Sequence, residues 1–290
     1  MADLLQFLMS GLTVGAVYAL LALGFTIIFN ASGVVNFAQG EFVMLGGMGT
    51  AFAIAAGLPV PLAALLAILG TAAVGVALNR LAIAPARGAP VVSLIIITIG
   101  AAIFLQGAAG LIFDKQIHRY PGFSGEAPLR LAGATLLPQS LWVMAGAALT
   151  FAALWLFFTR TLTGKAVLAT ANNPLAASLV GINTKAIMAL SFGLSAAIGA
   201  VAGVLVTPIT MTAYNTGVAL ALSGFAATML GGLGNPLGAL AGGLLLGVLE
   251  ALTAGYVSSQ YKDAVSFILI ILVLALMPQG LLGRKSTDRV

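Results

Sequence analysis

The sequence predicts an all-α polytopic membrane protein with eight or nine transmembrane helices, arranged as an inverted repeat of two helical groups with broken helices. Of the 290 residues, 61% are hydrophobic and only 7% are charged, and the mean hydropathy is +1.13. Such a chain has too little polar surface to enclose a water-soluble core. Apolar runs of about 20 residues recur from end to end, which is the length that a helix needs to cross a bilayer. Cysteine is absent, so disulfides and thiolate metal sites are excluded.

Eight apolar stretches define the expected spans. The stretches are 5–29, 36–56, 62–81, 91–113, 140–158, 186–208, 220–253 and 264–277. The second is broken before Pro59 and Pro61, because proline cannot continue a helix. The seventh is too long for one span and contains Gly231-Gly232-Leu233-Gly234-Asn235-Pro236, so we expect two shorter helices that meet there. Nine crossings result, and eight crossings with a re-entrant pair are the alternative.

The cations of the connecting segments predict the orientation of the chain. One side holds eight of the 12 Lys and Arg residues, namely Arg80, Arg87, Arg160, Lys165, Lys185, Arg284, Lys285 and Arg289. The other side holds the remaining four, namely Lys115, Arg119, Arg130 and Lys262. Because cytoplasmic loops carry the excess of positive charge, we expect the first side to be cytoplasmic. The N-terminus then lies outside and the C-terminus inside.

A short internal echo suggests how the spans are grouped. Met44-Leu45-Gly46-Gly47 recurs as Met229-Leu230-Gly231-Gly232, in the second helix of two groups that enter the membrane in opposite directions. Inverted repeats with Gly- or Pro-interrupted helices are a signature of transporters, although four letters can also match by chance in so Gly-rich a chain. We therefore divide a single permease domain into three parts. They are a first repeat (1–113), an external loop with a linking helix and a cytoplasmic loop (114–185), and a second repeat with a short cytoplasmic tail (186–290).

The segment 160–185 stands apart from the spans, because it is Ala-rich, has helix-compatible spacing and carries cations at both ends. Pro174 suits a first helical turn after two asparagines, and Gly181 can end that helix. Such a projection would let a membrane subunit take mechanical input from a soluble partner, with small residues that allow close approach. The candidate coupling residues are Gly164, Lys165, Asn172, Asn173, Pro174, Ala176, Ala177, Gly181 and Asn183. The alternative is a passive amphipathic loop that lies on the membrane.

Only two charged residues fall inside the expected spans, Glu41 and Glu250. A charge at the bilayer centre costs roughly 2.5–3.5 kcal/mol on insertion scales, so neither side chain should face lipid while ionised. Glu250 shares a helical face with Gly243, Gly247 and Ala254, which should pack closely on another helix or subunit. Glu250 is therefore either a pathway or gate residue, or a buried acid bonded to a neighbouring helix.

Polar residues also cluster between the first and second expected spans and at the start of the second. Asn36 and Gln39 share one helical face, and Glu41 points about 200° away from Gln39 if the segment is regular helix. These residues are either caps near the cytoplasmic boundary, or a gate or a contact with a partner protein. When residues of the seventh stretch are added, the candidate pathway or gate residues are Asn36, Gln39, Glu41, Gly231, Gly232, Asn235 and Glu250.

No catalytic, cofactor or metal-binding constellation is present, so we expect a non-catalytic subunit. Gly164-Lys165 is followed by Ala166 and lacks the upstream glycine of a phosphate-binding loop. Any ATPase that drives the chain must therefore be a separate polypeptide. His118 is the only histidine, and we expect a solvated residue of an external loop rather than a metal ligand. The basic residues are too dispersed for nucleic-acid binding.

Three motifs are similar to those of one family. Residues 33–47, Gly-Val-Val-Asn-Phe-Ala-Gln-Gly-Glu-Phe-Val-Met-Leu-Gly-Gly, resemble the N-terminal signature of branched-chain amino-acid ABC importer permeases, in particular the first of the two permease subunits. Tyr261-Lys262-Asp263-Ala264 with Pro278-Gln279-Gly280-Leu281-Leu282-Gly283 resembles the C-terminal signature of the same subunit. Residues 174–183 resemble the family's cytoplasmic coupling loop, E-A-A-x-x-x-G, with Ala176, Ala177 and Gly181 at the matching positions.

The resemblance implies a multi-pass permease in a bacterial inner membrane that works with several partners. These are a second related permease that shares the pore, two cytoplasmic ABC ATPase subunits, and an external binding protein that delivers Leu, Ile or Val. Two positions depart from the family pattern. Leu175 stands where the general coupling motif has Glu, and Met277 stands where relatives often have Arg. The first departure removes a charged contact with the ATPase, and the second removes a cation at the inner boundary.

Two other functions fit parts of the sequence. A secondary transporter driven by an ion gradient also uses inverted repeats and broken helices, and Glu250 is its only candidate ion site. A passive channel lacks the ring of charges or carbonyl-rich repeats that it needs. The substrate is not fixed by the residues, because related permeases carry other amino acids, amides or urea.

Overall fold

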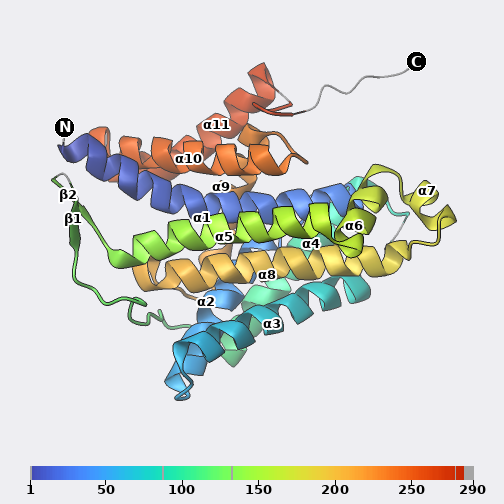
Figure 1. Ribbon diagram of the computed structural model, residues 1–290, viewed down its shortest axis with the longest axis horizontal. Coiled ribbons are helices and arrows are strands. Elements are labelled where there is room, and N and C mark those ends of the chain that lie inside the picture. The colour runs from blue at the N-terminus through green and yellow to red at the C-terminus, as the bar shows by residue number, and fades with distance from the viewer. Residues whose placement is uncertain (1, 87, 132, 278, 284–290) are drawn as a thin grey trace.

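The computed structural model describes residues 2–86, 88–131, 133–277 and 279–283, and these form an elongated helical bundle (Figure 1). Arg87, Pro278, Arg284, Lys285 and Arg289, which the sequence argument uses, lie outside the described residues. The helices are α1 (Ala2–Ser32), α2 (Gln39–Ala55), α3 (Val60–Leu78), α4 (Val91–Ile112), α5 (Pro138–Arg160), α6 (Leu162–Asn172), α7 (Pro174–Leu179), α8 (Thr184–Thr210), α9 (Thr216–Gly231), α10 (Pro236–Tyr256) and α11 (Lys262–Leu276). A π-helical turn (Asn79–Ile83) extends α3, and a 3-10 turn (Ser259–Tyr261) precedes α11. The strands β1 (Leu129–Leu131) and β2 (Ala134–Leu136) form an antiparallel hairpin.

Six of the described helices are long and apolar enough to cross a membrane, namely α1, α3 with its π-helical turn, α4, α5, α8 and α10. The apolar helices α9 and α11 are shorter, and α2 has 17 residues. Every expected span contains one of these helices, and the interruption of the seventh stretch does separate two of them. The predicted fold class, a polytopic all-α membrane protein, is therefore confirmed.

One expectation about the start of α2 is wrong. Asn36 lies before this helix and so shares no helical face with Gln39.

Proline and asparagine fix where several helices begin. The helices α3, α5, α7 and α10 each carry Pro at their first or second position, where the missing N–H leaves no intrahelical bond unmade. The side chains of Asn173, Asn183 and Asn235 each accept a hydrogen bond from the first turn of the helix that follows them. These caps satisfy backbone donors that would otherwise have no partner.

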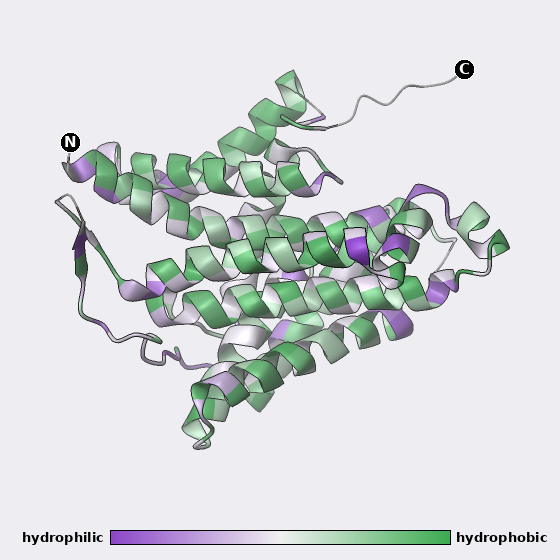
Figure 2. Cartoon of the chain, in the orientation of Figure 1, coloured by the Kyte–Doolittle hydropathy of each residue, from purple (hydrophilic) through white to green (hydrophobic). Residues whose placement is uncertain are grey.

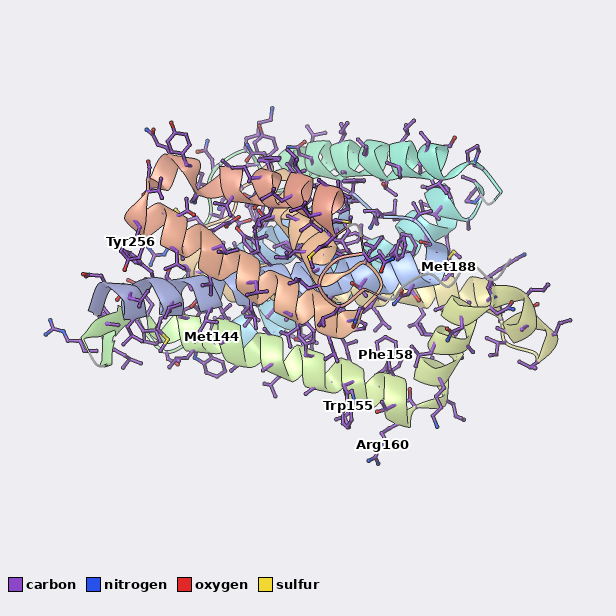
Figure 3. All side chains as sticks on the ribbon, turned by 90° about the horizontal axis from the view of Figure 1, so that it is seen from above. Met144, Trp155, Phe158, Arg160, Met188 and Tyr256 are labelled. Atoms are coloured by element: carbon purple, nitrogen blue, oxygen red, sulfur yellow. The ribbon has the colours of Figure 1, made fainter. Side chains whose placement is uncertain are left out.

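The bundle has a buried centre and an apolar exterior. Within the most apolar part of α1, 83% of residues are buried, compared with 6% in α4. The helix α8 is as central as α1, whereas α3, α4 and α5 present large apolar side chains outward (Figure 2). Trp155 of α5, for example, points away from the bundle (Figure 3). An exposed surface of this composition fits hydrocarbon rather than water.

The two ends of the bundle hold different loops. The amino-terminal end holds the start of α1, the β-hairpin and the turn after α10, since Gln6 bonds to Thr135 and Phe7 packs on Tyr256. We call residues 161–183, with the short helices α6 and α7, the elbow, and the opposite end the elbow end (Figure 1). The turn between α9 and α10 lies at the elbow end, because Asn30 at the close of α1 bonds to Gly234.

Glycine lets the central helices approach one another closely. The α10 residues Gly243 and Gly247 face the backbone of α1, with Gly247 against Gly11 and Gly15. Gly75 of α3 faces Phe192 and Ala196 of α8 in the same manner. The small-residue face predicted around Glu250 is thus used inside the chain. Such close packing of small residues is the usual source of helix association in lipid.

The helix contacts form an inverted repeat. When α1, α2 and α3 are exchanged with α8, α9 and α10, the main contacts between helices find a counterpart: α1 with α10 becomes α8 with α3, α2 with α8 becomes α9 with α1, and α2 with α3 becomes α9 with α10. The short helices α2 and α9 begin beside each other, with Gly40 of α2 against Gly217 and Ala221 of α9. They then run towards opposite ends of the bundle. Their amino ends therefore meet inside the protein, as broken helices do in transporter repeats.

The four-letter echo in the sequence does not mark equivalent positions of the two repeats. Gly46 of α2 faces Ala200 of α8, and the corresponding contact in the second repeat is Gly224 of α9 against Leu21 of α1. Gly231, the echo's counterpart of Gly46, lies instead at the end of α9 against Gly238. The repeat is present, but its register differs from that of the echo.

The glycine contact between α1 and α10 predicts a stability effect. Gly247→Leu should lower the melting temperature of the detergent-solubilised protein by several degrees, because overpacking costs about 1–3 kcal/mol. Gly70→Leu on α3 is the matched control, since Gly70 faces open space. Equal melting temperatures for the two variants, measured by tryptophan fluorescence and size exclusion, would contradict the proposed packing.

Candidate functional site

The predicted pathway residues occupy three separate places rather than one site. Asn36, Gln39 and Glu41 lie where α2 meets α9. Gly231, Gly232 and Asn235 lie at the turn between α9 and α10. Glu250 lies in a cavity between α10 and its neighbours. A fourth place, the elbow, holds the predicted coupling residues.

The first place is a buried hydrogen-bond network at the start of α2. Gln39 Nε2 donates to the carbonyl oxygen of Ser195 at 3.2 Å. The Ser195 hydroxyl lies 2.6 Å from Gln39 Oε1 and 2.9 Å from the carbonyl oxygen of Gly24. Both side chains are fully buried, so this network ties α2 to α1 and α8 inside the bundle. The expectation of a boundary cap is wrong for Gln39, whereas Asn36 Oδ1 does accept a hydrogen bond from the Ala38 N–H.

Glu41 is the most unusual residue of this junction. Its side chain is 1% exposed, and Oε2 has no hydrogen-bond partner among the described residues. The carboxyl group lies against Gly217, the second residue of α9, at the amino end where a helix favours negative charge. Asn36 Nδ2 is also buried without a partner among these residues. Buried polar atoms without a partner are rare in folded proteins, so this junction is a candidate functional place.

The second place is a turn at the elbow end. Gly232 and Gly234 have φ angles of +104° and +88°, which an L side chain rarely adopts. Asn235 caps α10, and its Nδ2 donates to the carbonyl oxygen of Leu282 at 2.7 Å. The backbone N–H of Leu281 donates to Leu230. The turn is therefore tied to the C-terminal segment and lies apart from Glu250.

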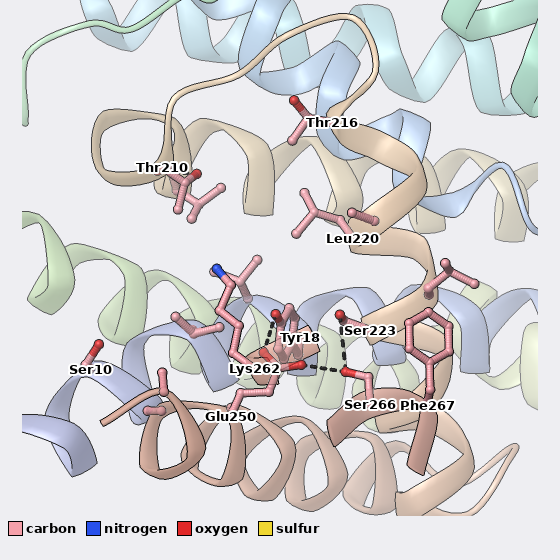
Figure 4. Close-up of a pocket in the computed structure, with 18 residues that line it drawn as sticks. Ser10, Tyr18, Thr210, Thr216, Leu220, Ser223, Glu250, Lys262, Ser266 and Phe267 are labelled. Carbon is pink, nitrogen blue, oxygen red and sulfur yellow. Dashed lines mark hydrogen bonds between the residues drawn. The ribbon is translucent and has the colours of Figure 1, made fainter. Parts of the chain in front are cut away.

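The third place surrounds Glu250, which is 5% exposed. Its carboxylate accepts hydrogen bonds from the Tyr18 hydroxyl at 2.7 Å and from the Ser266 hydroxyl at 2.5 Å (Figure 4). Ser223 Oγ lies 3.5 Å from Ser266 Oγ. Sequence reasoning missed Tyr18, Ser223 and Ser266. A tyrosine and two serines within apolar helices were the available signal, because such hydroxyls seek a partner in lipid.

The elbow has the local structure that the sequence predicts. Asn173 caps α7 and Pro174 is its first residue, while Gly181 ends the turn with φ +87°. Gly164 lets α6 lie directly on the end of α5 at Phe157. Lys165, Asn172 and Ala176 are exposed, and Asn183 caps α8.

One expectation about the elbow is wrong. Ala177 is 3% exposed and faces the chain's own helices, so it cannot contact a partner. At the tip of the elbow, formed by α7 and the turn after it, the exposed apolar side chains are instead Leu175, Leu179 and Val180, which are 71%, 81% and 77% exposed. The departure at Leu175 therefore places an apolar side chain, rather than a charge, at the tip of the projection.

At the amino-terminal end, the loop between α4 and β1 is pinned to α8. His118 and Thr212 exchange two backbone hydrogen bonds, and Tyr120 donates to the carbonyl oxygen of Val204 at 2.6 Å. Burial raises the pKa of Tyr120 above its ordinary value. The His118 ring lies 2.8 Å from Asp114, and this hydrogen bond lowers the pKa of the Asp114 carboxyl. His118 is thus bonded within the loop rather than freely solvated.

Buried polar groups along broken helices, inside a bundle that exposes apolar side chains, define a membrane transport protein of the permease class. The model of the family described as "Branched-chain amino acid transport system / permease component" matches residues 7–274. The chain belongs to this family.

Several curated proteins are similar over nearly the whole chain. The high-affinity branched-chain amino acid transport system permease BraD of Pseudomonas aeruginosa is 38% identical, with 99% of this chain and 98% of BraD covered. LivH of Salmonella typhimurium, with the same description, is 37% identical over 99% of this chain and 97% of its own. The ribose import permease RbsC of Haemophilus influenzae is 29% identical over 93% of this chain and 84% of its own. Among solved structures, PsaBC from Streptococcus pneumoniae shares the fold, with a TM-score of 0.51, 14% identity, and 94% of this chain and 92% of that chain covered.

The contact between Glu41 and Gly217 predicts a compensated pair of substitutions. Gly217→Ala should destabilise the protein, because the new methyl carbon would lie 2.5 Å from Glu41 Oε2. Glu41→Ala should restore much of that loss in the double variant, with a coupling of about 0.5–3 kcal/mol. Thermal unfolding of the four proteins in detergent measures the cycle. Strictly additive effects would mean that the two residues do not touch.

Proposed function

We propose that this chain is the membrane-spanning permease subunit of an ATP-driven importer that carries branched-chain or similar hydrophobic amino acids across the bacterial inner membrane. Its partners would be a second related permease, two cytoplasmic ABC ATPase subunits and an external binding protein. The chain itself would be non-catalytic, since its sequence has no phosphate-binding loop for ATP. The similarity to BraD and LivH over nearly the whole chain supports the substrate class.

The single observation that carries the coupling role is the exposed apolar tip of the elbow. Leu175, Leu179 and Val180 lie on a projection that stands clear of the long helices (Figure 1). Exposed apolar residues on such a projection are typical of a surface that a partner covers. The described cations Arg80, Arg160, Lys165 and Lys185 belong to segments at this end, which supports a cytoplasmic elbow and an external N-terminus.

In the proposed mechanism, closure of the ATPase pair moves the elbow, and the elbow moves the helices on which it rests. The helix α6 lies on the end of α5 through Gly164, and α7 continues through Gly181 and Asn183 into α8. The helix α8 holds Gln39 through Ser195. A shift of α8 would therefore change the junction of α2 and α9, where Glu41 is packed. On this proposal residues 1–113 and 186–290 act as the two repeats, and 114–185 links them.

The predicted gate residues would act at two levels of this path. Asn36, Gln39 and Glu41 would change partners as α2 and α9 separate. Gly231, Gly232 and Asn235 would form the hinge that lets α9 move relative to α10, because they lie where one helix ends and the next begins, and small residues at such positions can absorb backbone rotations. The residues are conduits and pivots rather than catalysts.

Transport by the reconstituted assembly tests this proposal. Leu175→Lys should reduce ATP-dependent uptake of labelled leucine into proteoliposomes by at least about tenfold, because a buried charge at an apolar contact costs on the order of 2 kcal/mol, and a cation is also opposite in sign to the Glu of the general motif. Leu175→Met is the matched control and should retain uptake. The ATPases, the second permease and the binding protein are present in both preparations. Unchanged uptake by Leu175→Lys would refute the coupling role, and uptake by the chain alone under an ion gradient would identify a secondary transporter.

A further inference from the structure

A cavity of about 570 Å³ lies between α1, α8, α9, α10 and α11, in the half of the bundle nearer its amino-terminal end (Figure 4). This volume lies within the range of small-molecule binding sites in proteins, which is about 300–1,000 Å³. The description of the family names the class of substrate that the system transports, but it does not say where this chain would bind a substrate. The chemistry of the cavity wall addresses that question.

The floor of the cavity is acidic. Glu250 lies there with Tyr18, Ser223 and Ser266, and all four side chains are buried. A carboxylate provides about four lone-pair sites for hydrogen bonds, so it can receive an ammonium group of a ligand in addition to hydroxyl donors. The hydroxyl groups of Tyr18 and Ser266 also hold the carboxylate in a fixed orientation. An ionisable residue so placed within a membrane domain is a candidate for a functional site.

The mouth of the cavity carries positive charge. Lys262, the first residue of α11, is exposed and lines the cavity (Figure 4). The cavity also reaches Thr216, the first residue of α9, but the amino end of that helix already faces the Glu41 carboxyl group, so the positive charge of the mouth comes from Lys262. Positive charge at the mouth and negative charge at the floor would orient a small molecule that carries both charges.

The remaining walls are mostly apolar, and the hydroxyl groups of Ser10 and Thr210 are the exceptions. Val14 and Val17 of α1, Leu220 of α9 and Phe267 of α11 line the space between floor and mouth. Gly247 and Ala251 on α10 leave that space open, because neither has a side chain beyond Cβ. These walls fit an aliphatic side chain, and they offer few partners for the several hydroxyl groups of a sugar.

We propose that this cavity is a transient binding site for a zwitterionic aliphatic amino acid. Glu250 receives its ammonium group, Lys262 its carboxylate, and the apolar walls its side chain. The proposal rests on the proposed function for its substrate class, and it adds that selection occurs within the membrane subunit as well as in the binding protein. The affinity is low, since a transported molecule must leave each site that it enters.

Protection of a single cysteine tests the proposal in the isolated chain. The chain has no native cysteine, so Ala254→Cys places one thiol in the cavity wall. Millimolar L-leucine should slow alkylation of this thiol by a small maleimide. Leucinamide, which lacks the carboxylate, and 4-methylpentanoate, which lacks the ammonium group, should protect at least about tenfold less well. A cysteine at Leu141, exposed on α5 and outside the cavity, is the control and should react at one rate throughout.

Two further substitutions test which residue binds the ammonium group of leucine and which binds its carboxylate. Glu250→Gln keeps the shape of the side chain and should raise the leucine concentration for half-protection at least about tenfold. Lys262→Met should do the same, and because Lys262 is exposed this variant is expected to fold normally. Glu126→Gln, in an exposed ion pair with Arg119 outside the cavity, should leave protection unchanged.

The outcomes separate this inference from the proposed function. Protection by leucine in the isolated chain, with no ATP-dependent uptake by the assembly, would support the site and refute the importer. Uptake by the assembly without protection, or with full protection in both charge variants, would overturn the site and leave the importer standing. A thiol at position 254 that never reacts would also overturn it, because the cavity would then be closed to solutes. Protection by phosphatidylethanolamine vesicles in place of leucine would assign the cavity to a lipid headgroup and overturn it as well.

Discussion

The structure depends on one constraint, which is that backbone polar groups inside a membrane must be satisfied within the protein. Two non-helical segments, 33–38 and 211–215, precede the half-helices α2 and α9. In the first, the Phe37 N–H donates to Thr98 of α4, and in the second, Thr212 exchanges two hydrogen bonds with His118. Partners from outside each segment thus add to local bonds such as that from the Ala38 N–H to Asn36 Oδ1. Broken helices persist here because neighbouring elements complete their hydrogen bonds.

Glycine allows the helices to pack closely enough to surround these non-helical segments. The helices α1 and α8 pass through the middle of the bundle, and α10 and α3 lie against them where glycine removes the side chain. Larger side chains at these helix contacts would push the long helices apart and expose the backbone of the non-helical segments to lipid. Close packing also brings the buried carboxyl group of Glu41 against Gly217. A titratable group is therefore packed between the half-helices α2 and α9. The proposed importer uses this arrangement, because a small shift of α8 reaches both half-helices.

The sequence predicts the parts of the fold that depend on local chemistry. Apolar runs locate the spans, Asn173 and Pro174 locate the start of α7, and Gly181 locates its end. Features that depend on contacts between distant residues are missed. The register of the repeat follows Gly46 and Gly224 rather than the four-letter echo, because contacts with α8 and α1 define it. Similarly, helical periodicity cannot show that Ala177 faces inward, or that Tyr18 and Ser266 converge on Glu250.

The central claim is that force from an ATPase enters this chain through the elbow. The most direct test is a cross-linking measurement on the assembled complex with Leu175→Cys, which gives the chain a single thiol at the exposed tip of α7. A short thiol-to-amine cross-linker should join this position to the ATPase subunit, and the yield should change when ATP binds. Absence of that product, together with modification of the thiol by a membrane-impermeant reagent from the external face of intact cells, would contradict the account.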